Sequence, residues 1–395
     1  METKIFKNKE ISKWLVLLFA SACGIIVANL YYAQPVVGLI SKDIGLPLDS
    51  AGVIVTVTQL GYALGLLFFV PLSDLLENKK LIVGILLIAI VGLILAVVAK
   101  NSVLFLIAAT MIGLGSVAAQ ILVPLASCLV PDDQRGKMIG NVMSGLLLGI
   151  MLARPISSFL AGISSWNLVF LLSAVLMTLL IIVLRKQLPS RQPIQDEKYT
   201  TIIKSMGRLL LEEKILRRRA LYQATLFGVF SLFWTVTPQW LASNYNLTQP
   251  EIAVFALVGV AGAVAAPIAG RLADKGWTER LTGLAFIMAS ISFVIPRLYS
   301  GNKLISLIIL CFSAVVLDCS VSGNLVLGQQ KIYGLDAKRR GRMNGVFMAI
   351  FFMGGALGSS VGGYTYVHYG WNGVSILGSV FPMLGMIYFL TEFKK

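Results

Sequence analysis

The chain has 395 residues, of which 57% are hydrophobic and only 13% are charged. Soluble domains reach an apolar fraction of roughly 45–50% only when glycine is counted, and the 37 glycines here raise the fraction well above that range. A water-soluble fold of this size is excluded, because its interior could not hide so much apolar surface. At about 20 residues per crossing, the composition predicts an all-α polytopic membrane protein with roughly a dozen spans.

Twelve apolar runs succeed one another along the chain, each long enough to cross a bilayer. One long polar stretch, 185–219, separates the first six runs from the last six. We therefore expect two six-helix bundles, at residues 1–184 and 220–395, joined by a cytoplasmic linker at 185–219. The predicted membrane-spanning helices occupy residues 14–40, 51–72, 81–99, 102–129, 138–162, 166–184, 220–243, 251–270, 281–299, 304–329, 343–366 and 372–391.

The basic residues indicate how these helices are oriented. The net charge is +15, and if the N-terminus faces the cytoplasm, 28 of the 33 lysines and arginines lie on the cytoplasmic side. Four lie in the outer loops or at the outer end of a span, and Arg154 alone lies well inside one. Because cytoplasmic loops are enriched in basic residues, we predict a multi-pass protein with both termini in the cytoplasm. This distribution explains the charge excess without a nucleic acid partner.

The linker contains an amphipathic segment, TTIIKSMGRLLLEEKILRRR. Its apolar residues Ile202, Met206, Leu209 and Leu216 follow helical spacing, and basic residues surround them. Such a helix can lie on the inner leaflet, where anionic lipid attracts lysine and arginine. It can equally be a solvated linker helix without a lipid role, and both interpretations are kept open.

Cysteine and histidine usage argues against several kinds of site. Cys23, Cys128, Cys311 and Cys319 lie in or beside apolar runs without metal or disulfide spacing, and His368 is the only histidine. The sequence also lacks a phosphate-binding GxxxxGK[ST] loop, which argues against an ATP-driven pump. We therefore predict no metal site and no cofactor, and we do not expect the chain to be an enzyme.

The two halves of the chain repeat one another. The segment RGKM at 135–138 is matched 205 residues later by RGRM at 340–343. Asp74 and Asp274, each at the end of an apolar run, are 200 residues apart. Parallel repeats of this kind place a substrate site between the halves, near the bilayer midplane.

The segment GRLADKG at 270–276 is similar to the loop motif of the major facilitator superfamily, and Asp74 is its first-half counterpart. ANLYYAQP in the first span and GLLLGIMLARP in the fifth resemble the twelve-span bacterial antiporters that export drugs, sugars and metabolites. The resemblance implies a major facilitator fold that works by alternating access, as a monomer in the bacterial inner membrane. It also implies export of small organic compounds in exchange for protons.

Two ionisable residues lie well inside predicted spans: Asp318 in the tenth and Arg154 in the fifth. Charges at membrane depth are unfavourable and usually mark an ion or substrate path. A carboxylate held between burial and a nearby cation can load and release a proton, so we predict that Asp318 and Arg154 form the proton-coupling site. The fourth span, ATMIGLGS, lacks the arginine usual in the resembled family, which suggests that this chemistry has moved. Arg154 either pairs with Asp318, binds an anionic substrate group or a backbone carbonyl, or extends to the membrane surface.

Polar and aromatic residues in the cavity-lining spans are candidates for substrate contact. In the resembled superfamily, spans 1, 4, 7 and 10 line the cavity, which favours Tyr32, Gln34, Gln120, Trp234 and Asn324. Aromatic faces with few fixed polar groups suit an apolar or amphipathic ligand. The same residue types also pack between helices or lie at the headgroup level.

Three charged loop residues are predicted to gate the cytoplasmic side. Asp74 can lie at the positively charged N-terminal end of the eleventh span, near Arg342, and Asp274 is its repeat in the second half. The alternative is a surface salt bridge that contributes little to stability.

These features predict a secondary transporter that binds a small-molecule substrate and protons within the lipid bilayer. Proton-coupled or facilitative uptake is the main alternative, because Asp318 would serve either direction. A receptor-like protein that kept the fold without transport is a further alternative, and the two buried charges argue against it.

Overall fold

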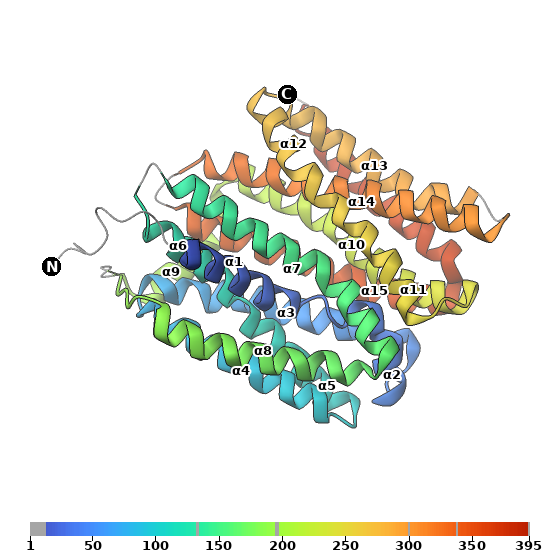
Figure 1. The fold of residues 1–395 in the computed structure, drawn as a ribbon. Coiled ribbons are helices and arrows are strands. Elements are labelled where there is room, and N and C mark those ends of the chain that lie inside the picture. The colour runs from blue at the N-terminus through green and yellow to red at the C-terminus, as the bar shows by residue number, and fades with distance from the viewer. Residues whose placement is uncertain (1–12, 132–133, 194–196, 299–300, 337–338, 394–395) are drawn as a thin grey trace.

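The computed structural model describes residues 13–131, 134–193, 197–298, 301–336 and 339–393 as helices joined by turns (Figure 1). Several basic residues that enter the orientation argument, Lys4, Lys7, Lys9, Lys338, Lys394 and Lys395, lie outside these described residues.

The helices follow the predicted spans in chain order. The first half contains α1 (Lys13–Ala28), α2 (Val37–Asp43), α3 (Val53–Phe68), α4 (Asn78–Val98), α5 (Ser102–Ser116), α6 (Ala118–Cys128), α7 (Arg135–Ile163) and α8 (Trp166–Gln187). The linker holds α9 (Tyr199–Glu212). The second half contains α10 (Lys214–Tyr245), α11 (Gln249–Ala256), α12 (Gly262–Asp274), α13 (Thr278–Leu298), α14 (Lys303–Tyr333) and α15 (Arg340–Leu390). Short 3-10 helices lie at η1 (Gln34–Val36), η2 (Leu48–Ser50), η3 (Val70–Asp74) and η5 (Leu257–Ala261).

Each of the twelve predicted spans has a helical counterpart. Within the described residues, ten helical segments are long and apolar enough to cross a bilayer. One of them, α15, has 51 residues and is broken at Gly370 (φ 60°, ψ −162°), so it supplies two crossings. The positive φ favours glycine, which has no Cβ to clash. The short helix α1 is completed by the turns after Ala28, η1 and α2. The predicted all-α, twelve-span fold is therefore confirmed.

Four spans predicted as continuous helices are interrupted: the second changes from α3 to η3, the fourth turns at Val117 between α5 and α6, and the first and eighth are also broken. The first, predicted over 14–40, ends as α1 at Ala28 and restarts at η1, and the eighth passes through the 3-10 helix η5. Asn29 stabilises the first break, because its amide donates to the Ile25 and Ile26 carbonyls (both 3.1 Å). Irregular backbone at membrane depth is tolerated where protein buries it, and interrupted helices commonly carry substrate or ion sites.

Small residues let the first helix of each half pack tightly against the fifth. A Cβ added to Gly149 of α7 would lie 2.2 Å from the Gly24 carbonyl oxygen of α1. One added to Gly358 of α15 would lie 1.8 Å from the Gly228 carbonyl oxygen of α10. The α1–α7 contact is thus repeated by the α10–α15 contact, as expected for two copies of one architecture.

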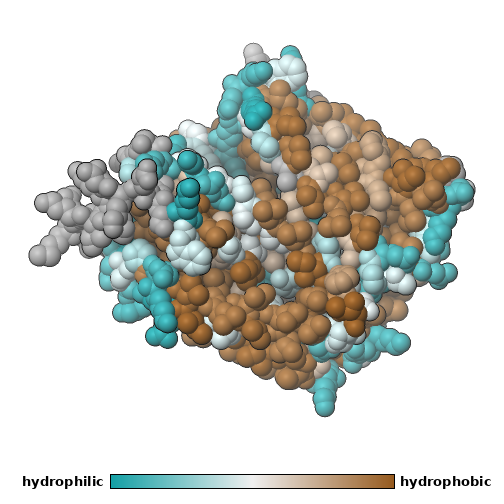
Figure 2. Space-filling model, viewed as in Figure 1, coloured by the Kyte–Doolittle hydropathy of each residue, from teal (hydrophilic) through white to brown (hydrophobic). Residues whose placement is uncertain are grey.

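The outer surface is apolar along the middle of the helices. Figure 2 shows a broad hydrophobic belt, with hydrophilic residues gathered towards the ends of the helices. On α7, Leu148, Leu152, Ile156 and Phe159 form an exposed stripe at helical spacing. Such a belt matches the hydrocarbon core of a bilayer, in which exposed leucine and isoleucine are favourable.

We call the end of the molecule where α1 begins and the second crossing of α15 ends the terminal side. The two halves pack closely at the opposite end. Thr56 Oγ1 of α3 donates to the Ala356 carbonyl of α15 (2.9 Å), and Ser158 Oγ of α7 donates to the Gln249 carbonyl of α11 (2.8 Å). Backbones approach so closely that a Cβ on Gly52 would lie 2.1 Å from a carbonyl oxygen of α15. Contacts between the halves therefore close this opposite side.

The linker helix α9 packs on the protein itself. Its apolar face is buried, and it contacts η3, α10 and α15. The Tyr199 hydroxyl donates to the Phe68 carbonyl at the end of α3 (2.8 Å), and Ser205 Oγ accepts from Arg342 at the start of α15 (3.2 Å). The helix thus bridges the two halves on the terminal side. Neither the lipid-bound nor the solvated interpretation described this placement, because the sequence does not reveal which surface covers an apolar stripe.

Candidate proton and substrate site

Asp318 lies halfway along α14, with its carboxylate buried. Its Oδ1 accepts a hydrogen bond from the indole Nε1 of Trp234 in α10 (2.9 Å). On its other side are η5 and the start of α12: a Cβ on Gly259 of η5 would lie 2.8 Å from Oδ2, and one on Gly262 of α12 would lie 3.0 Å from the Asp318 Cβ. The two glycines therefore leave room for the carboxylate beside the interrupted span.

Arg154 of α7 is only 3% exposed. Its Nε donates to Gln34 Oε1 in η1 (2.8 Å). Its guanidinium carbon lies over three aromatic rings, at 5.1, 4.8 and 4.5 Å from their centroids, those of Tyr31, Phe230 and Trp234 respectively. Cation–π contacts stabilise a desolvated cation by about 2 kcal/mol, so the aromatic cage offsets part of the unfavourable burial.

The two buried charges meet at Trp234. Its ring face contacts Arg154, and its N–H binds Asp318. Among the described residues, Arg154 forms neither an ion pair with Asp318 nor a hydrogen bond to a backbone carbonyl, although the two charges are close enough to interact. Of the sequence-based alternatives, direct pairing and carbonyl binding are therefore not realised in this structure. Trp234 lies between a first-half cation and a second-half carboxylate, and we predict that it positions the two charges.

Replacing Trp234 with phenylalanine tests this role. The variant keeps a ring under Arg154 but removes the N–H donor, and a hydrogen bond to a buried charged group contributes about 1.5–3 kcal/mol. We expect pH-gradient-driven transport to fall about tenfold or more, with a changed pH profile, and folding to be retained. Trp240→Phe is the matched control, since Trp240 stacks on Trp371 outside this centre. A wild-type pH profile in Trp234→Phe would contradict the assignment.

The predicted substrate residues separate into two groups. Gln34 and Trp234 belong to the centre just described. Tyr32 is buried next to it, and its backbone carbonyl accepts from Ser157 Oγ (2.6 Å). Gln120 and Asn324 lie in separate hydrogen-bonded pairs.

Those two pairs each lie within one half of the molecule. Gln120 Nε2 donates to the Tyr62 hydroxyl (3.0 Å). Asn324 Nδ2 donates to Gln223 Oε1 (2.7 Å). Among the described residues, neither pair is hydrogen-bonded to Arg154 or forms part of its aromatic cage, so their role in substrate contact stays a prediction.

Several residues of the centre are not among the favoured substrate residues or the predicted coupling pair. Tyr31 and Phe230 complete the cage around Arg154, and Gly259 and Gly262 make space for Asp318. The only sequence signals were the run ANLYYAQP, whose Asn and Pro mark the break in the first span, and the glycine pair in the eighth. Phe230 carries no such signal, because a buried phenylalanine in an apolar helix is ordinary.

The predicted gating residues lie on the terminal side. Arg342 forms an ion pair with Glu197 of the linker (2.6 Å). Asp74 lies near enough for its charge to interact with that of Arg342. Asp274 accepts a hydrogen bond from the Gln330 amide within the second half. Glu197 is therefore a partner that the sequence did not single out, and gating stays a prediction.

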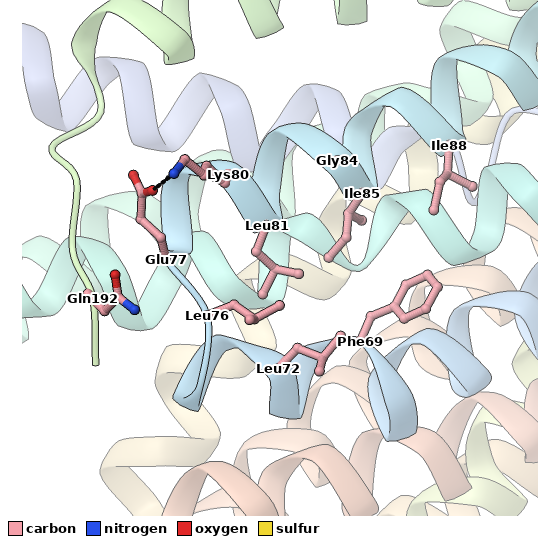
Figure 3. Close-up of a pocket in the computed structure, with 10 residues that line it drawn as sticks. All are labelled: Phe69, Leu72, Leu76, Glu77, Lys80, Leu81, Gly84, Ile85, Ile88 and Gln192. Carbon is pink, nitrogen blue, oxygen red and sulfur yellow. Dashed lines mark ion pairs between the residues drawn. The ribbon is translucent and has the colours of Figure 1, made fainter. Parts of the chain in front are cut away.

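Two apolar recesses lie apart from Arg154. One, of about 560 Å³, lies between η3 and α4, with the linker residue Gln192 at its edge (Figure 3). Its rim carries the Glu77–Lys80 ion pair (3.0 Å), and a hydrogen bond from Ser190 together with Lys80 holds the pKa of the Glu77 carboxyl below its usual value. The other, of about 500 Å³, lies between α12, α13 and α14 and is lined in part by Asn324. Within the described parts of the chain, no cluster of three or more histidine, cysteine or acidic side chains could hold a metal ion.

Twelve spans, two repeated halves and buried charges between the halves are typical features of multi-pass membrane transporters. The chain belongs to the Major Facilitator Superfamily, whose family profile matches residues 16–333. It is 37% identical over 389 residues to the uncharacterized transporter YgaY of Escherichia coli O157:H7, covering 98% of each chain. It is 21% identical to a protein named as a probable sugar efflux transporter of Mannheimia succiniciproducens, covering 100% of this chain and 97% of the relative.

A solved structure supports the same fold. A bacterial homologue of the human lysosomal transporter Spinster, in an inward-facing and occupied conformation, superposes with a TM-score of 0.77, covers 97% of each chain and is 14% identical. The predicted family and fold are confirmed, and the chain is a transporter rather than an enzyme.

Proposed function

We propose that the protein exports a small organic compound by alternating access, in exchange for protons. The observation that supports this proposal most is the buried Arg154–Trp234–Asp318 arrangement. A protein of this fold that does not transport has no evident need to bury two charges at membrane depth. Similarity to a relative named as an efflux transporter supports the direction.

In this arrangement, protonation of Asp318 would change how strongly the two halves of the protein attract one another. Arg154 lies on α7 of the first half, while Trp234 and Asp318 lie on α10 and α14 of the second. A proton on Asp318 removes the negative charge that attracts Arg154, so it weakens the attraction between the halves. A change in interface strength biases a two-state equilibrium between the halves. The proton and the substrate would both act on that equilibrium.

The proposed orientation places the terminal side in the cytoplasm of a bacterium, with the protein as a monomer in the inner membrane. The enrichment of basic residues on that side supports it. Residues 1–184 and 220–395 then act as the two moving bundles, and 185–219 joins them on the cytoplasmic side. Asp74, Asp274 and Arg342 would gate the same side, together with Glu197.

Vesicles of both orientations test the proposal. Inverted and right-side-out vesicles are given a pH gradient and a radiolabelled panel containing an aromatic carboxylate, a neutral sugar and a lipophilic cation. Proton-driven accumulation in inverted vesicles is the expected result. Accumulation in right-side-out vesicles would instead indicate uptake, and accumulation in neither orientation with any panel compound would contradict proton-coupled transport.

Uptake of an anionic solute together with a proton is the second candidate, and one observation favours it. Among the described residues Arg154 Nη2 has no hydrogen-bond partner, and the charge of Arg154 interacts with that of Asp318. An anion at that donor and a proton on Asp318 would favour one another electrostatically. The titratable side chains of Tyr31 and Cys319 also lie close enough to interact with the charges of this centre. The vesicle experiment separates the two directions.

A further inference from the structure

On one edge of the Arg154 guanidinium, only one of the two N–H donor atoms has an acceptor among the described residues. Nε and Nη2 are the two donors of the edge that carboxylates commonly bind through two parallel hydrogen bonds. Gln34 Oε1 accepts from Nε (2.8 Å), whereas Nη2 is buried without a hydrogen-bond partner among the described residues. A buried donor without an acceptor is unfavourable, and more so when it is charged. Protein interiors seldom retain such a group without a reason.

Gln34 adds a second unused donor at the same place. An amide has one acceptor oxygen and one donor nitrogen, and because Arg154 can only donate, the oxygen must face it. The Gln34 Nε2 is thereby fixed as a donor, and it too is buried without a partner. Gln34 is 0% exposed, and Arg154 is 3% exposed. Two buried donors on one hydrogen-bonded pair thus lack an acceptor.

The surroundings of this pair suit an anion with an apolar body. Tyr31, Phe230 and Trp234 enclose the guanidinium. These rings supply apolar surface that can contact the body of a ligand. The rings provide no acceptor oxygen, so a negatively charged group of the ligand would be needed to pair with the guanidinium. The interrupted first span carries Gln34 and Tyr31, so a rearrangement of that segment would alter access to the pair.

We propose that Arg154 and Gln34 form a subsite for the anionic group of the substrate, a carboxylate in the simplest case, which makes the substrate an amphipathic organic anion. This inference rests on the proposed function, since it assumes that the centre binds the transported compound. It holds for export and for uptake. The ligand would supply the missing acceptors to Arg154 Nη2 and Gln34 Nε2.

Binding to the purified full-length protein in detergent tests the subsite without any gradient. The probes are 2-naphthoate and 2-naphthamide, which share a ring system and differ in charge, at constant ionic strength. We expect 2-naphthoate to raise the thermal unfolding temperature in a saturable way and 2-naphthamide to have no effect at equal concentration. Equal effects of the two probes, or no effect of 2-naphthoate, would overturn the proposal.

Three variants assign the effect to the residues. Gln34→Glu brings a carboxylate of the chain itself to the Arg154 edge, so the protein should unfold at an equal or higher temperature and its half-saturating 2-naphthoate concentration should rise at least tenfold. Arg154→Lys keeps the charge but loses the two-donor edge, and a similar loss is expected. Gln187→Glu, at the exposed end of α8, is the matched control and should bind as the wild type does. Unchanged binding in Gln34→Glu would overturn the proposal.

The two failures are distinguishable. Carboxylate binding that depends on Arg154 and Gln34, without pH-gradient-driven transport, would preserve the subsite and contradict the proposed function. Gradient-driven transport by a protein that binds 2-naphthoate and 2-naphthamide equally would support the proposed function and contradict the subsite.

Discussion

Vesicles that carry Asp318→Asn should accumulate no more substrate in response to a pH gradient than vesicles without the protein. Asparagine is nearly isosteric with aspartate and can still accept the Trp234 hydrogen bond (2.9 Å in the wild type), so the fold should persist. It has no exchangeable carboxyl proton, and a proton-driven cycle then has no site to load. The measurement is the initial rate of gradient-driven accumulation, and substrate exchange without a gradient should remain.

The chain offers a matched control for this variant. Asp43 Oδ2 also accepts a hydrogen bond from an indole, that of Trp166 (2.7 Å), but Asp43 is exposed at the end of α2. Asp43→Asn therefore makes the same chemical change in the same kind of pair, away from Arg154. It should transport at the wild-type rate. Gradient-driven transport by Asp318→Asn at the rate of this control would show that the proton is carried elsewhere.

Gly358→Val should prevent the protein from folding or leave it too unstable to purify. The added Cβ would lie 1.8 Å from the Gly228 carbonyl oxygen, and a helix backbone cannot yield as a flexible side chain can. Overpacking in a tight core costs about 1–3 kcal/mol and occasionally more, and a clash with backbone belongs at the upper end. The measurement is the yield of monodisperse protein and its thermal unfolding temperature in detergent.

Gly84→Val is the control for that substitution. Gly84 lies within α4, and nothing lies within 4 Å of an added Cβ. The same change should therefore leave the yield and the unfolding temperature close to those of the wild type. Equal stability of the two variants would contradict the tight α10–α15 packing.

The twelve spans could be predicted because their signal is local. Most of the apolar runs are separated by charged residues, and the 205-residue repeat identifies the halves. The break at Asn29–Ala33 was not predicted from hydropathy, since this short polar segment lies inside a long apolar run and is averaged out over the length of a span. It depends on partners from elsewhere, such as Ser173 Oγ, which donates to Asn29 Oδ1 (2.5 Å). Long-range contacts of this kind have no signature in a single sequence.

The candidate site shows the same division. Arg154 and Asp318 were identifiable because charge is rare at membrane depth. Their meeting through Trp234 was not, because residues on three different helices come together only through the packing of the two halves. Phe230, which completes the cage, is one of 20 phenylalanines in the chain and carries no distinguishing pattern.

The central claim is that proton movement passes through Asp318 within the Arg154–Trp234–Asp318 centre. The most direct measurement is substrate-induced proton flux in proteoliposomes with an entrapped pH dye and no imposed gradient, using a compound identified in the vesicle panel. Wild type and Asp43→Asn should shift the internal pH on substrate addition, whereas Asp318→Asn should move substrate without a pH change. A pH change of wild-type size in Asp318→Asn would contradict this account.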